Sequence, residues 1–195
     1  MWSFIAGRSR AAAAAIMCMV ATVPADAGEI ADQATLAENL LGRGYDAAAL
    51  SAFDKAASAF WEASPLQVRT AVFVDAAEGF SRYEPRVGGA FSPGDTMAIY
   101  LEPFGFTYLP DGEGVAGALA VDLQIQTPGG LILATSEDFG ELTWRGRMAL
   151  HEVHATVELP VPDLKPGAYQ LMLTLRDTGA DDAASVTLPF TIDPA

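Results

Sequence analysis

The sequence predicts a mainly β protein, an antiparallel β-sandwich of about seven or eight strands preceded by an α-helical hairpin. Residues 29–64 are rich in alanine and leucine, contain no proline, and repeat their apolar side chains at helical spacing. From Leu66 onward the apolar period changes to two, which is typical of strands with one buried face. No helical pattern follows Ser64, and parallel strands need a helical crossover, so we expect the strands to pair antiparallel.

Composition restricts the class of protein and of partner. The chain has 195 residues, of which 51% are hydrophobic and 18% charged, and this balance excludes a disordered chain. Acidic residues outnumber basic ones by 25 to 11, for a net charge of −14. A chain this acidic repels nucleic acids and anionic lipid surfaces. We therefore expect neutral or basic partners and no nucleic acid.

Residues 1–27 have the features of a secretory signal peptide. Arg8 and Arg10 make the start basic, residues 11–23 form an apolar run, and small residues precede a cleavage position before Gly28. The apolar run is too short to cross a bilayer as a helix, so removal is favoured over a retained anchor. We expect a periplasmic or secreted protein with no stable membrane insertion after signal removal.

The single cysteine of the chain, Cys18, lies inside this signal. Residues 28–195 therefore contain no cysteine, which excludes disulfides, thiol catalysis and thiolate metal sites there. The stability of the exported part has to come from its apolar core.

Residues 28–64 are expected to form the helical hairpin, with a break at Gly42-Arg43-Gly44 and an end at Ser64-Pro65. Each helix has one apolar face, which we expect to dock on the domain that follows. The residues of these faces are Ile30, Ala34, Ala37 and Leu41 in the first helix, and Leu50, Phe53, Ala57 and Phe60 in the second.

The segment 44–56 resembles the second half of a tetratricopeptide repeat in the spacing of its alanines and Phe53. The resemblance covers about one repeat, and no second copy follows, whereas such arrays need about three repeats. Small alanines let two helices approach closely and a phenylalanine fills the gap, so any tight hairpin selects the same residues. We favour the simple hairpin.

Residues 65–195 are expected to form the sandwich. Turn signals at 110–112, 128–130 and 165–167 separate the strands, and Pro189 places the last strand at an edge or a bulge, because proline cannot donate to a ladder. The expected strands lie near 67–75, 79–83, 95–102, 115–127, 131–135, 147–159, 167–176 and 184–193.

The segments 164–169, 174–177 and 187–192 resemble the closing hairpin of immunoglobulin-like and fibronectin type III-like domains in bacterial envelope proteins. The resemblance covers about thirty residues and implies an immunoglobulin-like sandwich. The cysteine and tryptophan hallmarks of true immunoglobulin domains are missing, and no functional residue is carried over. As a whole, the chain resembles secreted and periplasmic proteins of Gram-negative bacteria that join a helical lead to a β-sandwich.

The sequence contains no motif for catalysis or for a cofactor. His151 and His154 are three residues apart on an expected strand, where they point to opposite faces, so we predict no metal site and a hydrogen-bonded His151 at the rim of the core. Serine-nucleophile and phosphate-binding motifs are missing, so no catalytic residue is assigned. Asp177, Asp181 and Asp182 share one loop, which is either a calcium site or a solvated acidic turn.

The candidate binding residues are Phe104, Phe106, Tyr108 and Glu102, where a strand leads into an aromatic loop. Exposed, the aromatic side chains would hold a sugar ring or a partner's apolar face. Alternatively, Phe104 and Phe106 cover the end of the sandwich or join the hairpin to it, with Glu102 a buried, hydrogen-bonded acid. Its expected counter-charges are Arg82, Arg86, Arg145 and Arg147.

These observations favour a non-catalytic binding or assembly module of the cell envelope that recognises a protein or glycan partner. The alternative is a carboxylate-dependent envelope enzyme such as a glycan hydrolase, which needs two carboxylates held across a cleft. A deep pocket with two facing carboxylates would favour the enzyme, and a flat or convex aromatic patch would favour binding.

Overall fold

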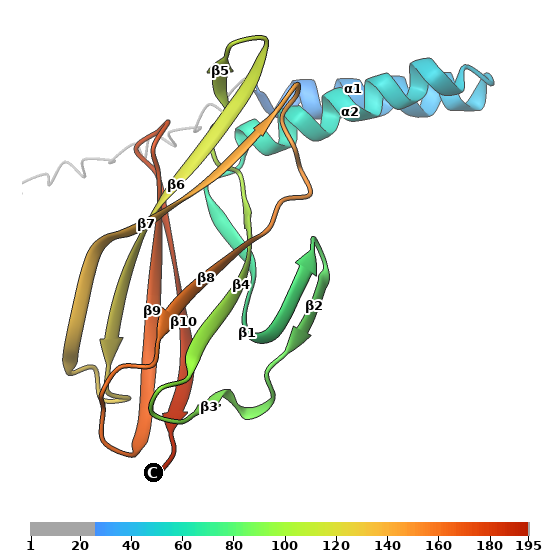
Figure 1. The fold of residues 1–195 in the computed structure, drawn as a ribbon. Helices are drawn as coiled ribbons and strands as arrows, with labels where there is room; N and C mark the ends of the chain where they lie inside the picture. The colour runs from blue at the N-terminus through green and yellow to red at the C-terminus, as the bar shows by residue number, and fades with distance from the viewer. Residues whose placement is uncertain (1–25, 195) are drawn as a thin grey trace, which may run out of the picture.

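The computed structural model describes residues 26–194 (Figure 1). Two helices come first and ten strands follow in two sheets. The predicted signal segment 1–27 lies outside the described residues except for its last two, so the signal stays a prediction. Neither described helix is both long and apolar enough to cross a bilayer.

The hairpin consists of α1 (Asp26–Gly42) and α2 (Asp46–Ala63), with the break where the glycines predict it. Gly44 has a φ of 77°, in the left-handed region that favours glycine, so it allows the chain to reverse between the helices. In Figure 1 the hairpin projects sideways from one end of the sandwich, where α1 begins and α2 ends.

Apart from Phe60, whose ring reaches Phe104 of β4, the predicted apolar faces of the helices do not dock on the sandwich. The helices instead pack against each other through alanines, with Ala37 of α1 and Ala49, Ala52 and Ala56 of α2 buried. The large side chains that were expected to dock, Leu50, Phe53 and Phe60, are 62%, 61% and 53% exposed. Alanines occupy the interface between the two helices because their small side chains let the helix axes approach closely. The expectation that phenylalanine fills the gap between the helices is wrong.

The two sheets face each other as a sandwich. The four-stranded sheet has the order β2-β1-β4-β8, and the six-stranded sheet has the order β3-β10-β9-β6, with β5 and β7 both pairing with β6. The strands of the first sheet are β1 (Gln67–Gly79), β2 (Arg82–Pro85), β4 (Thr96–Phe104) and β8 (Ala155–Pro160). Those of the second are β3 (Ala90–Phe91), β5 (Leu109–Asp111), β6 (Gly114–Gln126), β7 (Ile132–Gly146), β9 (Gly167–Asp177) and β10 (Ala183–Ile192).

This topology confirms the predicted fold class. Neighbours β10-β9-β6-β7 take the positions of strands G, F, C and C′ of an immunoglobulin-like sandwich, and β1-β4-β8 take those of A, B and E. All pairings are antiparallel except that of β3 with β10, which is parallel and joins only two residues of each strand. Pro189 pairs with Gln170 on one side, and β3 reaches only Thr191 and Ile192 on the other, so the proline lies on an open edge.

Several strand boundaries differ from the prediction. β1 extends to Gly79 instead of residue 75, and β2 begins at Arg82 instead of residue 79. The strand expected over 147–159 begins only at Ala155, because residues 147–154 form a loop. β7 is much longer than the expected 131–135. Its polar segment between Ser136 and Gly140 looks like a turn in sequence, but it forms a bulge in which Asp138 has a φ of 51°. The short strands β3 and β5 had no sequence signal.

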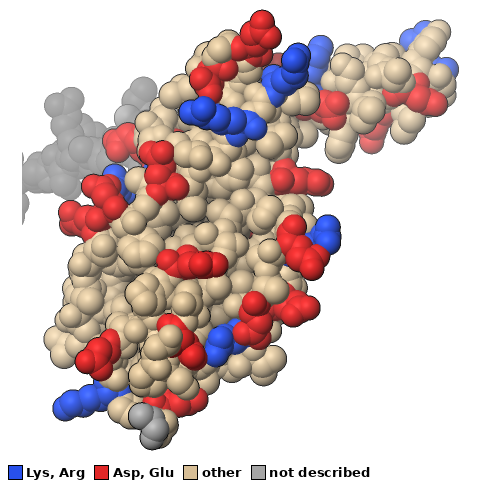
Figure 2. Space-filling view, viewed as in Figure 1, with Lys and Arg blue, Asp and Glu red and all other residues tan. Residues whose placement is uncertain are grey.

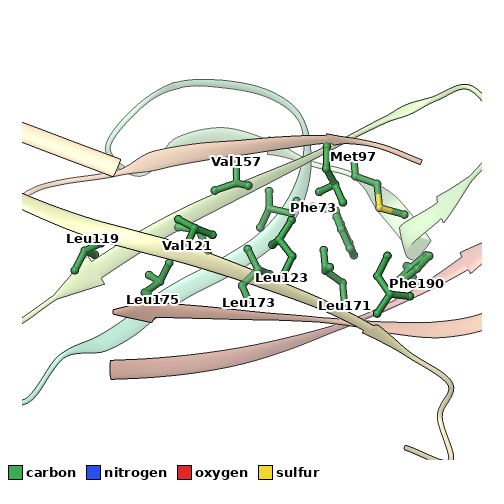
Figure 3. Packing of buried hydrophobic residues seen from close by; sticks show 14 of the residues in the cluster. Phe73, Met97, Leu119, Val121, Leu123, Val157, Leu171, Leu173, Leu175 and Phe190 are labelled. Carbon is green, nitrogen blue, oxygen red and sulfur yellow. The ribbon is translucent and has the colours of Figure 1, made fainter. Parts of the chain in front are cut away.

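The core lies between the sheets and follows the predicted period of two. Leu171, Leu173 and Leu175 of β9 are fully buried. They lie beside Val121 and Leu123 of the neighbouring β6 and pack against residues of the other sheet such as Phe73 and Val157, as Figure 3 shows. Phe73, Phe91 and Phe190 fill the end of the core away from the hairpin, with ring centroids 5.0–6.4 Å apart.

Replacing Leu173 by alanine should lower the free energy of unfolding by about 2–5 kcal/mol, because the change leaves a cavity at a fully buried position. The same change at Leu131, which is exposed, should stay within about 0.5 kcal/mol of the unmodified protein. Urea denaturation followed by far-ultraviolet circular dichroism measures both. Equal losses at the two positions would contradict this description of the core.

Candidate functional site

The hairpin meets the sandwich at an aromatic cluster centred on Trp61, which is 3% exposed. Its ring centroid lies 4.6 Å from that of Phe104, 5.2 Å from Phe106, 6.2 Å from Tyr108 and 5.2 Å from His151. These five residues are called the junction cluster below. They come from α2, from the end of β4 and the loop after it, and from the loop before β8.

A hydrogen bond and a glycine set the position of Trp61. The indole Nε1 donates to the carbonyl oxygen of Phe106 at 2.7 Å, which satisfies the one polar atom of a buried ring. Gly105 has a φ of 83°, and a Cβ there would lie 2.5 Å from the carbonyl oxygen of Pro65. Only glycine therefore lets the loop after β4 pass this close to the end of the hairpin.

Phe106 is the inner part of the junction cluster. It is 1% exposed and stacks on Trp144 of β7 with a centroid distance of 4.7 Å. A Cβ at Gly117 of β6 would overlap the ring of Phe106, so the missing side chain at residue 117 makes the room for this ring.

The acidic loop between β9 and β10 also holds the junction between the hairpin and the sandwich, through hydrogen bonds to its backbone. The Asp182 carboxylate accepts the backbone N–H of Leu66 at 2.6 Å, and the Asp177 carboxylate accepts those of Thr107 at 2.7 Å and Gly179 at 2.8 Å. Asp181 is exposed. Two of the three calcium candidates therefore serve as acceptors for backbone donors, and within residues 26–194 no three ligating side chains converge on a metal position.

A cavity of about 220 Å³ opens beside the junction cluster, lined by Ser58, Glu62, Tyr108 and His151 among others. Glu62 is its one carboxylate among the described lining residues, so the cavity offers no carboxylate pair. The Tyr108 hydroxyl donates to the carbonyl oxygen of Leu150 at 3.1 Å, and burial raises the pKa of Tyr108. The walls thus combine aromatic rings with polar side chains, among them Ser58, Glu62 and Thr107.

The two histidines lie in the loop before β8 and contact different residues. His151 packs on Trp61, whereas the His154 ring stacks on Tyr100 with a centroid distance of 5.7 Å. The two imidazole rings do not converge on one position, as the sequence predicts. They lie in a loop, however, and not on the expected strand. The prediction that His151 is hydrogen-bonded is wrong for its Nε2 atom. This atom is buried and has no hydrogen-bond partner among the described residues.

Glu102 lies on β4 as a buried, hydrogen-bonded acid, and it is 5% exposed. It accepts a hydrogen bond from the Tyr100 hydroxyl at 2.8 Å and one from the Thr70 hydroxyl at 2.9 Å. Its counter-charge is Arg69, at 3.6 Å, rather than any of the four arginines expected from sequence. Strand pairing explains the difference, because Thr70 of β1 lies opposite Glu102 and brings its neighbour Arg69 close.

This environment shifts the pKa values of both partners. Burial acts to raise the pKa of Glu102, but the hydrogen bonds from Tyr100 and Thr70 and the charge of Arg69 outweigh it, so the pKa is lowered. Burial and the hydrogen bond to Glu102 raise the pKa of Tyr100 to about 12. Glu102 is therefore an ionised structural anion, which is the wrong state for a general acid.

The structure thus divides the predicted site residues into two groups. Phe104, Phe106 and Tyr108 join the hairpin to the sandwich, which is the second of the two interpretations made from the sequence, and Glu102 lies apart from them in its own network. Sequence analysis missed Trp61, because it falls outside the stripe of Leu50, Phe53, Ala57 and Phe60. Its one sequence signal is a large aromatic just before the helix stop at Ser64-Pro65.

No protein-family model and no curated protein matches the chain. Solved structures similar to it include the sporulation control protein Spo0M of Bacillus subtilis, which is 8% identical with a TM-score of 0.36. That match covers 68% of this chain, and the chain spans about half, 51%, of Spo0M.

Two isolated domains are also similar. The PKD domain of an M14-like peptidase from a Thermoplasmatales archaeon is 13% identical, with a TM-score of 0.35 over 67% of this chain and 98% of that domain. The CARDB domain of a Pyrococcus furiosus protein is 9% identical, with a TM-score of 0.28 over 66% of this chain and 93% of that domain. With TM-scores this low, the fold class rests on the sheet order described above.

Replacing Gly117 by alanine should lower the free energy of unfolding by about 1–3 kcal/mol, because the new methyl group overlaps the enclosed ring of Phe106. Gly140 of β7 is the matched control, since a Cβ there meets nothing within 4 Å and its φ is not positive. Alanine at residue 140 should leave stability unchanged or raise it by up to about 1 kcal/mol. Urea denaturation followed by tryptophan fluorescence measures both variants, and equal stabilities would contradict the packing of Phe106.

The free energy of unfolding should fall between pH 10 and pH 12 through the titration of Tyr100. Unfolded tyrosine loses its proton near pH 10, whereas Tyr100 keeps it to about pH 12, so the folded state binds more protons across this interval and is destabilised as pH rises. Tyr100→Phe should remove this part of the slope. The variant should also cost about 1–3 kcal/mol at pH 7, because Glu102 and the Ser81 N–H lose a partner. Parallel pH profiles in urea denaturation would contradict the prediction.

Proposed function

We propose that this chain is an exported, non-catalytic binding or assembly module of the cell envelope that holds a protein partner on its helical hairpin. The observation that carries the proposal is the exposed apolar stripe of α2. Exposed apolar patches of this kind mark interaction surfaces, and amphipathic helices are a common element of protein recognition.

The stripe extends along α2 from its turn to the sandwich. Leu50, Phe53 and Phe60 stand at positions i, i+3 and i+10, which lie on one face of a helix. The Phe60 ring then continues to Phe104, with a centroid distance of 5.7 Å. At the other end, Leu41 is exposed beside the turn between the helices. A partner could therefore contact apolar side chains along the whole length of α2.

Charge supports a neutral or basic partner. The hairpin surface has many acids and few bases, and Figure 2 shows acidic side chains along its visible face. A partner with basic residues beside an apolar face would gain both burial and favourable electrostatics. The charged residues of α1, α2 and their turn with described side chains are Glu29, Asp32, Glu38, Asp46, Asp54 and Glu62, against Arg43 and Lys55.

Export is supported by the signal-like residues 1–27. For the enzyme alternative, glycan hydrolysis needs a carboxylate pair, whereas the cavity beside the junction cluster presents one carboxylate, Glu62; a neighbouring hollow on the hairpin adds Glu29 and Asp54. Glu102, a candidate binding residue in the sequence analysis, is hydrogen-bonded to Tyr100 and Thr70 and paired with Arg69.

A photo-crosslinking amino acid in place of Phe53, introduced in the producing cell, should give a discrete adduct with one envelope protein. The same amino acid in place of Lys55, two residues away on another face of α2, should give little or none. Leu50→Ser combined with Phe60→Ser should remove the adduct while the thermal midpoint stays within a few degrees, because both positions are exposed. Equal adducts from residues 53 and 55 would overturn the proposal.

A further inference from the structure

The flank of the sandwich between β7 and β8 is open. The four-stranded sheet ends at β8, whereas the six-stranded sheet continues past β6 to β7. In Figure 1 the lower part of β7, olive to gold, lies out to the side, beyond β8. A groove of about 200 Å³ lies in this flank, lined by Leu123, Ile125, Phe139, Leu159 and Pro160 together with small side chains of β7.

The pairing register of β7 with β6 explains why side chains of β7 do not fill the groove. Ala134 lies opposite Ile125, and Ser136 lies opposite Leu123, so both face the inner side of the sheet. Alanine and serine are too small to fill the space beside these core residues. In an immunoglobulin-like sandwich of the constant type, a further strand D pairs with strand E at this place. Here β8 takes the position of E, and no described strand pairs with its outer edge.

Two sheet edges border the groove. Each presents unpaired backbone N–H and C=O groups, which are a template for a further strand. On the outer edge of β8 the proline, Pro160, is the last residue of the strand, so residues 155–159 keep their backbone N–H groups for a further strand. Across the groove, Leu131, Ile132 and Leu133 at the start of β7 are exposed. Such an edge beside an apolar groove is the arrangement that binds extended peptides by strand addition.

We propose that the groove binds an extended segment of a partner protein, which adds to the outer edge of β8 as a further strand. Every second side chain of that segment is apolar and enters the groove over Leu123, Leu159 and Ser136. The alternate side chains point outward beside Glu158 of β8, which is exposed. This site is separate from the α2 stripe, so it can be tested without reference to the hairpin.

Charge selects the occupant. The added strand pairs with β8, whose one charged side chain is the exposed Glu158. The outward side chains of the added strand are therefore lysine or arginine, which form a cross-strand pair with Glu158 and are attracted by the acidic chain as a whole. A second copy of this chain is disfavoured, because each copy carries a net charge of −14.

The test uses the purified chain and a synthetic peptide of about eight residues in which valine and lysine alternate. The peptide should bind, and hydrogen exchange of the β8 backbone amides in residues 155–160 should become slower. A peptide with glutamate in place of lysine, and one with serine in place of valine, should each bind at least about tenfold more weakly, or about 1.4 kcal/mol. Fluorescence anisotropy measures the affinities.

Ser136→Trp should block the groove and lower the affinity for the lysine peptide at least about tenfold. Thr143→Trp is the matched control, because Thr143 is exposed on β7 opposite Ala118, outside the groove, and it should bind as the unmodified protein does. Both should keep the thermal midpoint of the unmodified protein. Glu158→Lys is an independent variant, which should weaken binding of the lysine peptide and strengthen binding of the glutamate peptide.

Three results would overturn the proposal. The first is equal affinity for the lysine, glutamate and serine peptides. The second is peptide-induced protection in α2 in place of β8. The third is protection of residues 155–160 that appears with rising protein concentration alone, since the occupant would then be a second copy.

Discussion

The burial of Trp61 at the end of α2 holds the two parts of the molecule together. One ring contacts residues from the end of β4, the loop after it and the loop before β8, and its nitrogen donates to the Phe106 carbonyl oxygen. The carboxylates of Asp177 and Asp182 secure the neighbouring backbone from the side of β9 and β10. Because these contacts are confined to one end of the hairpin, the rest of α1 and α2 depends on helix-helix packing alone.

That packing determines which side chains are available to a partner. The interface between the helices is built from small residues such as Ala52 and Ala56, so it has no room for leucine or phenylalanine. The large side chains of α2 are consequently displaced to a neighbouring face and stay exposed. On the sandwich, small side chains at Ala134 and Ser136 have a related effect, because they leave the β7–β8 flank unfilled. In both places small residues create the apolar surface that is proposed to bind.

The fold was largely predictable from sequence, because period and turn signals are local. The alternation around Leu171, Leu173 and Leu175, the break at Gly42 and the stop at Ser64-Pro65 each need only near neighbours. The bulge at Asp138 was not predictable, since the pairing of β6 with β7 continues across a segment that looks like a turn.

The candidate site was less predictable, because its contacts join distant segments. Periodicity identified the apolar residues of α2, but it could not decide between the alanine face and the leucine-phenylalanine face as the buried one. The counter-charge of Glu102 is Arg69. This pairing follows from the register of β1 on β4, and no spacing of residues along the sequence predicts it. The role of Asp182 likewise depends on Leu66, more than a hundred residues earlier.

The parallel pairing of β3 with β10 has a consequence for the order in which the chain matures. β10 supplies Phe190 and Ile192 to the core, and β3 and β9 hold it on either side, so the sandwich closes only once this late strand has arrived. Contacts so distant in sequence make folding slow. A ribosome that delivers the chain from its N-terminus would therefore expose a nascent polypeptide whose β-sheets stay open until β10 has emerged.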